Sequence, residues 1–179
     1  MHRRPLLGLL AAYEPFDASD RAARDRIDAF VREHEDCFER ALLVGHVTGS
    51  AWIVDPARGR CLLTHHRKLE RWLQLGGHAD GESDVLEVAL REAVEESGLA
   101  SLRVVSRAIF DCDVHGIPAR KSEPAHDHHD VRFLLEADPD EPLVVSEESK
   151  ELAWVRLEDV ARLAGDESVM RMVAKTPRR

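Results

Sequence analysis

The chain has little cysteine, a single tyrosine and no long apolar segment. Its three cysteines, Cys37, Cys61 and Cys112, are scattered and form no CxxC pair. This pattern argues against a disulfide framework and fits a reducing cytosol. No apolar run reaches the roughly 20 residues that a membrane-spanning helix needs.

A basic pair near the N-terminus, Arg3-Arg4, precedes a short apolar run over residues 6–12. A secretory signal needs a longer apolar run and a cleavage site made of small residues, but Tyr13-Glu14-Pro15 follows here. We therefore expect a cytoplasmic protein with no targeting segment and no membrane partner.

Positive charge is also scarce. The sequence has 25 lysines and arginines against 34 aspartates and glutamates, which gives a formal net charge of −9. A nucleic-acid duplex is bound through clustered Lys and Arg, so we expect no such partner. A small phosphorylated substrate remains compatible, because a bound divalent cation reverses the local field.

The N-terminal part of the chain has a helical pattern. In residues 17–34, apolar residues recur at helical spacing between charged residues, which predicts a helix with one apolar face. Asp17 or Ser19 can cap this helix. Residues 1–40 hold too few large apolar side chains for a core of their own. We therefore expect an N-terminal helical extension over residues 1–40 and a single domain over residues 41–179.

The rest of the chain mixes strand patterns with helix patterns. Runs of β-branched and apolar residues predict strands over residues 42–54, 60–64, 102–113, 131–136 and 153–157. A turn is expected over 55–59, a polar loop over 115–127, and helices over 158–164 and 168–175. Because strands and helices do not alternate regularly, the pattern favours an α+β fold or layered sandwich over a doubly wound sheet.

One further helix, from Asp84 to Ser97, concentrates negative charge. At about 100° per residue, one side carries Leu86, Leu90, Ala93 and Val94, and the opposite side carries Glu92, Glu95 and Glu96. Carboxylates at this spacing repel one another, so folding alone does not require them. A divalent cation would resolve the repulsion, because Mg²⁺ and Mn²⁺ prefer oxygen ligands; a solvated acidic face is the alternative.

The residues before this helix narrow the interpretation. Leu75-Gly76-Gly77-His78 predicts a glycine-rich loop whose backbone can approach a ligand closely. This loop and the segment Arg91-Glu92-Ala93-Val94-Glu95-Glu96-Ser97-Gly98-Leu99 together resemble the Nudix box, G-x5-E-x7-R-E-U-x-E-E-x-G-U, in which U is aliphatic. One position departs from that pattern. If Gly77 is the glycine of the box, its isolated glutamate falls on Ser83 and Glu82 lies one residue early. If Gly76 is that glycine, Glu82 keeps the x5 spacing, and eight residues instead of seven separate it from Arg91.

The resemblance implies a Nudix-like α/β/α sandwich with a mixed β-sheet in the domain over residues 41–179. It also implies a pyrophosphohydrolase, in which water attacks phosphorus in a nucleoside diphosphate linked to another group, or in a nucleoside triphosphate. By the same resemblance Arg91 orients the glutamates, and the ligands of Mg²⁺ or Mn²⁺ are Glu92, Glu95, Glu96, the carbonyl of Gly77 and, at the altered position, Glu82.

The residue that activates the water is sought in a later acidic loop. Glu147 and Glu148 precede Trp154, as loop acids in the Nudix family often precede a tryptophan. We expect Glu148 or its neighbour to orient or deprotonate the water, and a solvated acidic loop is the alternative.

Substrate contacts are expected from Arg67, Trp72, His78 and His128. Arg67 belongs to a compact basic group that would receive a phosphate, and Trp72 would stack on a base. His128 lies in a histidine-rich segment with His126. A zinc site formed by these two histidines, or simply exposed loop histidines, are the other interpretations.

Two functions stay open at this point. The altered first glutamate favours a nucleotide-binding or regulatory module without turnover, whereas the intact Glu92, Glu95 and Glu96 favour a hydrolase. Some Nudix hydrolases of diadenosine polyphosphates have a tyrosine after the box, but the only tyrosine here is Tyr13, before the box. A proline after the box is associated with ADP-ribose hydrolases, but Pro118 lies too far beyond the box to match it well. The expected partner is a small phosphorylated, nucleotide-like molecule, and a homodimer is left open.

Overall fold

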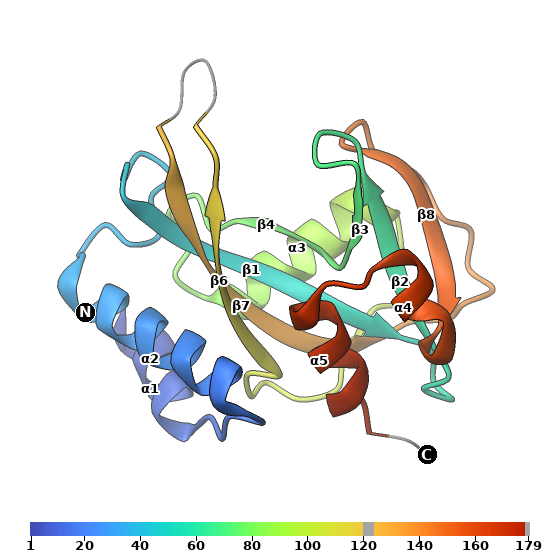
Figure 1. Cartoon of the computed structure of the whole chain (residues 1–179), viewed down its shortest axis with the longest axis horizontal. Helices are drawn as coiled ribbons and strands as arrows, with labels where there is room; N and C mark the ends of the chain where they lie inside the picture. Colours follow the sequence, from blue (N-terminus) through green and yellow to red (C-terminus); the bar gives the residue numbers. More distant parts are fainter. Residues whose placement is uncertain (120–123, 178–179) are drawn as a thin grey trace.

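A computed structural model describes residues 1–119 and 124–177, which fold around one mixed β-sheet flanked by helices (Figure 1). The helices are α1 (Arg4–Ala12), α2 (Ala18–Glu33), α3 (Val85–Ser97), α4 (Val160–Leu163), α5 (Glu167–Lys175) and the 3₁₀ helix η1 (Leu157–Asp159). The strands are β1 (Gly45–Val54), β2 (Arg60–His66), β3 (Arg71–Leu73), β4 (Leu75–His78), β5 (Arg103–Val104), β6 (Asp111–Ile117), β7 (His126–Glu136) and β8 (Ser149–Arg156). Among the described helices, none combines the length and apolar character needed to cross a membrane.

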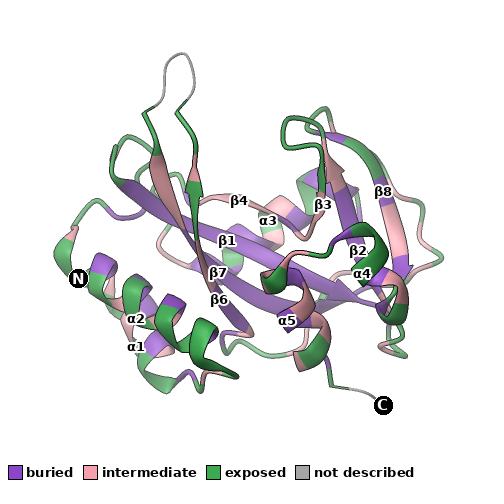
Figure 2. Cartoon of the chain, in the orientation of Figure 1, coloured by how far each residue is buried: buried purple, intermediate pink, exposed green. Residues whose placement is uncertain are grey.

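Strand β1 lies at the centre of the sheet. It pairs in parallel with β7, with Gly45 opposite Asp127 and Val54 opposite Glu136, and antiparallel with β2 and β4. Beyond these neighbours, β2 pairs with β3 and β8, and β7 pairs with β5 and β6, all antiparallel. Every residue of β1 is buried, so both faces of this strand are covered (Figure 2).

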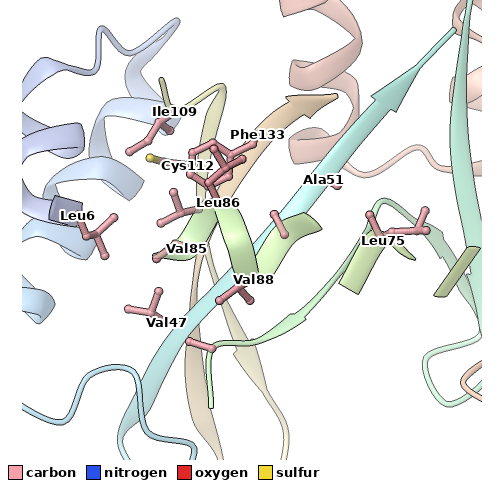
Figure 3. Close-up of a cluster of buried hydrophobic side chains, with 14 of the residues drawn as sticks. Leu6, Val47, Ala51, Leu75, Val85, Leu86, Val88, Ile109, Cys112 and Phe133 are labelled. Atoms are coloured by element: carbon pink, nitrogen blue, oxygen red, sulfur yellow. The ribbon is translucent and has the colours of Figure 1, made fainter. Parts of the chain in front are cut away.

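Side chains of β1 alternate between two packed layers. Val47 and Ala51 belong to a core shared with α1, α2 and α3, part of which Figure 3 shows. Trp52 and Val54 belong to a second core, which α4 and α5 cover. Helices on both faces of a mixed sheet confirm the predicted α/β/α sandwich.

The N-terminal helices pack into the same core as the sheet. Asp17, not Ser19, caps α2, because its carboxylate accepts a hydrogen bond from the backbone N–H of Asp20 at 2.8 Å. Leu6 and Leu10 of α1 are buried together with residues of β1 and α3. Residues 1–40 therefore contribute to one continuous core, and their status as a separate extension stays a prediction.

Several predicted elements were wrong in extent. The strand expected over residues 102–113 splits into β5 and β6, because the chain bends at residues 105, 107 and 108 and leaves residues 106–109 outside the strand pairing. The polar loop expected over 115–127 is strand at both ends, since β6 continues to Ile117 and β7 begins at His126. Residues 120–123 of that segment lie outside the described residues. Pairing between β6 and β7 overrides the low strand preference of their polar residues.

A buried ion network joins α2, the sheet and α5. Asp111 of β6 is fully buried, and its carboxylate accepts hydrogen bonds from Arg132 at 3.1 Å, Arg171 at 2.8 Å and Lys175 at 2.9 Å. Lys175 also donates to Asp20 of α2 at 2.8 Å. Lys175 of α5 thus bridges α2, from the N-terminal part of the chain, and strand β6.

Replacing Lys175 by methionine should destabilise the protein strongly. Lys175→Met leaves two buried carboxylates, Asp20 and Asp111, without a cation that both contact. Breaking a buried ion pair costs about 3–5 kcal/mol of unfolding free energy, measurable by urea denaturation. As a control, Arg162→Met removes an exposed pair with Asp159 and should cost less than about 1 kcal/mol. Equal losses in the two variants would contradict the role given to the buried network.

Candidate active site

Helix α3 carries the three predicted carboxylates on a well-defined scaffold. Its N-cap is Asp84, whose side chain accepts hydrogen bonds from the backbone N–H groups of Leu86 and Glu87. It ends at Gly98, which has a left-handed φ of 72°. Both ends confirm the helix that the sequence predicts.

The buried face of α3 is rotated from the predicted one. Val94, expected on the apolar side, is 46% exposed, whereas Glu96 is only 6% exposed. The physical reason is strand β4, which lies against α3: the backbone N–H of Gly76 donates to the Glu96 carboxylate at 2.9 Å. The three carboxylates therefore form a graded series, with Glu95 exposed, Glu92 half-buried and Glu96 buried.

The two glycines expected in a loop instead form strand β4. Gly76 and Gly77 lie opposite Ser50 and Gly49 of β1. A Cβ atom on Gly76 would collide with Ser50, and one on Gly77 would lie 2.5 Å from the carboxylate of Glu92. The close backbone approach that the sequence suggests is present, but a paired strand makes it.

Arg91 joins α3 to β4. Its guanidinium donates hydrogen bonds to Glu92 at 2.6 Å and to the backbone carbonyl of His78 at 3.0 Å. It also lies 3.7 Å from the carboxylate of Glu95. These contacts fit the orienting role that the resemblance implies, since charge-assisted hydrogen bonds fix carboxylate geometry.

Two carboxylates of α3, those of Glu92 and Glu96, resist ionisation. Burial, together with the charges of Glu92 and Glu148 and against a lowering by the backbone N–H of Gly76, raises the pKa of Glu96 to about 7. Burial also raises the pKa of Glu92. A buried carboxylate whose charged form is disfavoured gains most from a cation, and such groups are frequent in functional sites.

The loop acid Glu148 belongs to the same electrostatic cluster, because its charge raises the pKa of both Glu92 and Glu96. Arg67 holds this loop in place. Its backbone N–H donates to the carbonyl of Glu148 at 2.8 Å, and its guanidinium donates to the carbonyl of Glu147 at 3.0 Å. Arg67 therefore has contacts that position the loop, and its contact with substrate stays a prediction.

Two other predicted residues have partners of their own. Glu82 is exposed and accepts a hydrogen bond from the backbone N–H of Asp84 at 2.8 Å, which places it at the start of α3. Trp72 stacks on His65, with ring centroids 5.2 Å apart. The metal role of Glu82 and the substrate role of Trp72 stay predictions.

His78 and His128 lie on the opposite face of the sheet from α3. Adjacent residues in a strand point to opposite faces, so the side chain of His78 faces away from the side of Gly77 that meets Glu92. His128 lies opposite His46 of β1, and its ring centroid is 5.1 Å from that of His78. Both rings are half-buried in strands, so the interpretation as exposed loop histidines is wrong for His128. His46 was not predicted, because only the β1–β7 register reveals its neighbours.

The donor chemistry of α3 suits a hard divalent cation, because its three carboxylates are oxygen donors, which Mg²⁺ and Mn²⁺ prefer. Among the described residues these carboxylates are not gathered within 4.8 Å of one another, so binding would need their side chains to move together. The carbonyl of Gly77 stays a predicted ligand. Within the described residues, Glu96 has no Arg or Lys ion-pair partner, and its one hydrogen bond comes from Gly76. A bound cation would therefore balance the negative charge of Glu96, which no Arg or Lys side chain pairs with among the described residues.

Comparison with known proteins agrees with this geometry. The NUDIX domain model matches residues 45–175. Solved structures with a similar fold include an Ap4A hydrolase from C. elegans, which is 19% identical with a TM-score of 0.58, and covers 72% of this chain and 93% of that one. A NUDIX-family hydrolase from Clostridium perfringens is 24% identical with a TM-score of 0.56, and covers 73% of this chain and 95% of that one. A comparison with curated proteins finds no match. At these identities the solved structures establish the fold.

Replacing Glu96 by glutamine should stabilise the metal-free protein in a pH-dependent way. The pKa of Glu96 is about 7 in the folded state and about 4.3 when unfolded, so the folded state holds the extra proton between these values. Stability from this group is present below about pH 4 and is lost as the pH rises through about 7. Glu96→Gln keeps a neutral side chain at every pH. Its advantage in thermal unfolding with chelator should be on the order of 3 kcal/mol larger near pH 8 than near pH 4. An advantage that does not change with pH would refute the raised pKa.

Proposed function

This chain belongs to the Nudix family, and we propose that it is a metal-dependent pyrophosphohydrolase. The substrate would be a nucleoside diphosphate linked to another group, or a nucleoside triphosphate. In the reaction, the oxygen of water forms a bond to phosphorus, the phosphoanhydride bond to the leaving phosphate breaks, and the water loses a proton to a base.

The buried carboxylate of Glu96 carries this proposal. Burying this carboxylate between α3 and the backbone of β4, with a pKa of about 7, lowers the stability of the fold when the group is ionised. Folding alone therefore does not explain a glutamate at this position. A solvated acidic helix face would leave this carboxylate in water, whereas it is 6% exposed. The arrangement is therefore better explained by cation binding than by surface charge.

The residues around Glu96 would bind the metal ion and orient its ligands. Glu92, Glu95 and Glu96, with the carbonyl of Gly77, would hold Mg²⁺ or Mn²⁺. When bound, such an ion lowers the pKa of water and neutralises charge on phosphate oxygens. Arg91 orients Glu92 and keeps β4 beside α3 through its two hydrogen bonds.

The base would be Glu148. Its loop is held by Arg67, and its charge acts on both Glu92 and Glu96, so it lies at the edge of the carboxylate cluster. An exposed carboxylate can orient a water molecule and accept its proton while the buried carboxylates remain with the cation.

Incubation with a panel of nucleoside triphosphates, sugar nucleotides and dinucleoside polyphosphates, with the nucleotide products separated by chromatography, tests the function. Glu95→Gln and Glu96→Gln should each lower turnover with Mg²⁺ or Mn²⁺ by at least about 100-fold, because even residues that only support metal ligands are worth 10–100-fold. Glu87→Gln is the matched control, since Glu87 is an exposed residue on the same helix. Turnover that survives both site variants would refute the site. Wild-type protein that binds nucleotides but hydrolyses none would favour a binding module.

Glu148→Gln separates the base from the metal ligands. We expect turnover to fall by about 10²–10⁴-fold, the usual contribution of general base catalysis, while the affinity for Mn²⁺ measured by electron paramagnetic resonance changes little. Glu147→Gln, the neighbouring substitution in the same exposed loop, should leave turnover near the wild-type rate. An unchanged rate in Glu148→Gln would remove this residue from the mechanism.

A further inference from the structure

Three histidines form a compact cluster on the face of the sheet opposite α3. His46 of β1, His78 of β4 and His128 of β7 each offer one ring nitrogen, and these three atoms all lie within 4.8 Å of one another. The ring centroids are 5.0 Å apart for His46 and His78, 4.9 Å for His46 and His128, and 5.1 Å for His78 and His128. The rings therefore form a nearly equilateral triangle.

The register of three strands produces this triangle. His46 and His128 are directly opposite in the parallel β1–β7 pair. His78 is opposite Thr48, which is two residues along β1 from His46 and so on the same face. The ligands come from backbone positions fixed by the sheet, which is how a preorganised site is built.

The cluster leaves buried nitrogens without hydrogen bonds. His46 is 2% exposed, and within residues 1–119 and 124–177 neither of its ring nitrogens has a hydrogen-bond partner. The carbonyl of Leu42 lies near enough to favour the protonated ring but outside hydrogen-bonding geometry. Nε2 of His128 is likewise buried with no hydrogen-bond partner among the described residues. Buried polar atoms are normally paired, so these ring nitrogens are free to bind a ligand.

A positively charged ligand with a preference for nitrogen fits them best. Burial and the neighbouring histidines lower the pKa of His46 to about 4 and of His128 to about 2, so both rings are neutral at pH 7 and keep a lone pair. Neutral imidazole binds Zn²⁺ and related transition-metal ions, whereas Mg²⁺ prefers oxygen. We propose that His46, His78 and His128 form a binding site for a zinc-class ion, distinct from the carboxylates of α3.

A fourth histidine stands beside the triangle. The ring of His126 lies 5.0 Å from that of His46 and 5.3 Å from that of His128. Its Nδ1 is 2.9 Å from the carbonyl of Pro124, which can only accept, so Nδ1 donates and Nε2 keeps its lone pair. A ring held in this way by a backbone carbonyl is the usual support for a metal-binding histidine. His126 is therefore a candidate fourth ligand, and His115, whose ring centroid lies 5.4 Å from that of His128, is another.

Binding requires a small contraction of the cluster. Zinc–nitrogen bonds of 2.0–2.1 Å place tetrahedral ligand nitrogens about 3.3 Å apart, so the nitrogens must close by up to roughly 1.5 Å. We expect rotamer changes of the half-buried His78 and His128 rings, rather than a shift of the strands, to provide this movement.

Titration of the chelator-stripped full chain with Co²⁺ in excess Mg²⁺ tests the site. The Mg²⁺ occupies oxygen sites, so we expect one equivalent of Co²⁺ with the visible absorption of a tetrahedral ion, displaced by Zn²⁺. His78→Gln and His128→Gln should each weaken binding by about 100-fold. His34→Gln, which changes a histidine outside the cluster, should bind as the wild type does. Absence of tetrahedral Co²⁺, or an unchanged affinity in both cluster variants, would overturn the proposal.

A measurement on the wild-type chain guards against variants that fail to fold. X-ray absorption of the zinc-loaded protein should show at least three imidazole ligands. A shell of oxygen ligands alone would place the zinc at the carboxylates and overturn the histidine site. Glu92→Gln should leave the Co²⁺ spectrum unchanged, whatever it does to hydrolysis, so the two sites are tested separately.

Discussion

Asp111 has no exposed surface, so its negative charge must be balanced by other groups of the protein. Three cationic side chains form ion pairs with it: Arg132 of β7, and Arg171 and Lys175 of α5. Lys175 extends the pairing to Asp20 at the start of α2. Because an unpaired charge in this position costs several kcal/mol, α2, α5 and the β6–β7 pair are held in one arrangement. Arg132 of this network lies on β7, the strand that also carries His128 and pairs with β1.

The carboxylate helix was predictable because its signals are local. The spacing of Glu92, Glu95 and Glu96 follows the helical period within five residues of sequence, and both ends of the helix lie in the segment from Asp84 to Gly98. Strand β4 was not predictable from the sequence, because glycine has a low strand preference. Gly76 and Gly77 form a strand because they pair with β1, and their neighbours lie too close to admit a side chain. The burial of Glu96 follows from β4, so it was hidden for the same reason.

The pairing of β6 with β7 also could not be predicted from the local sequence. The ends of these strands are rich in His and Asp, a composition typical of a solvated loop, yet His115 and His128 lie opposite each other in paired strands. Tertiary pairing, not local preference, decides the structure there. The partner of His128 on β1 is about 80 residues away in the sequence, so no local pattern could place His46 beside it.

Strand β4 has consequences for how the chain tolerates changes in length. Gly77 and His78 are neighbours that face opposite sides of the sheet, so inserting or deleting one residue within β4 would exchange the two sides. Residues 79–84 follow as a loop in which Asp80 and Gly81 adopt positive φ values. An added residue in that loop leaves both sides of β4 in place. The one-residue departure at Glu82 and Ser83 therefore falls in the segment where an insertion does the least damage.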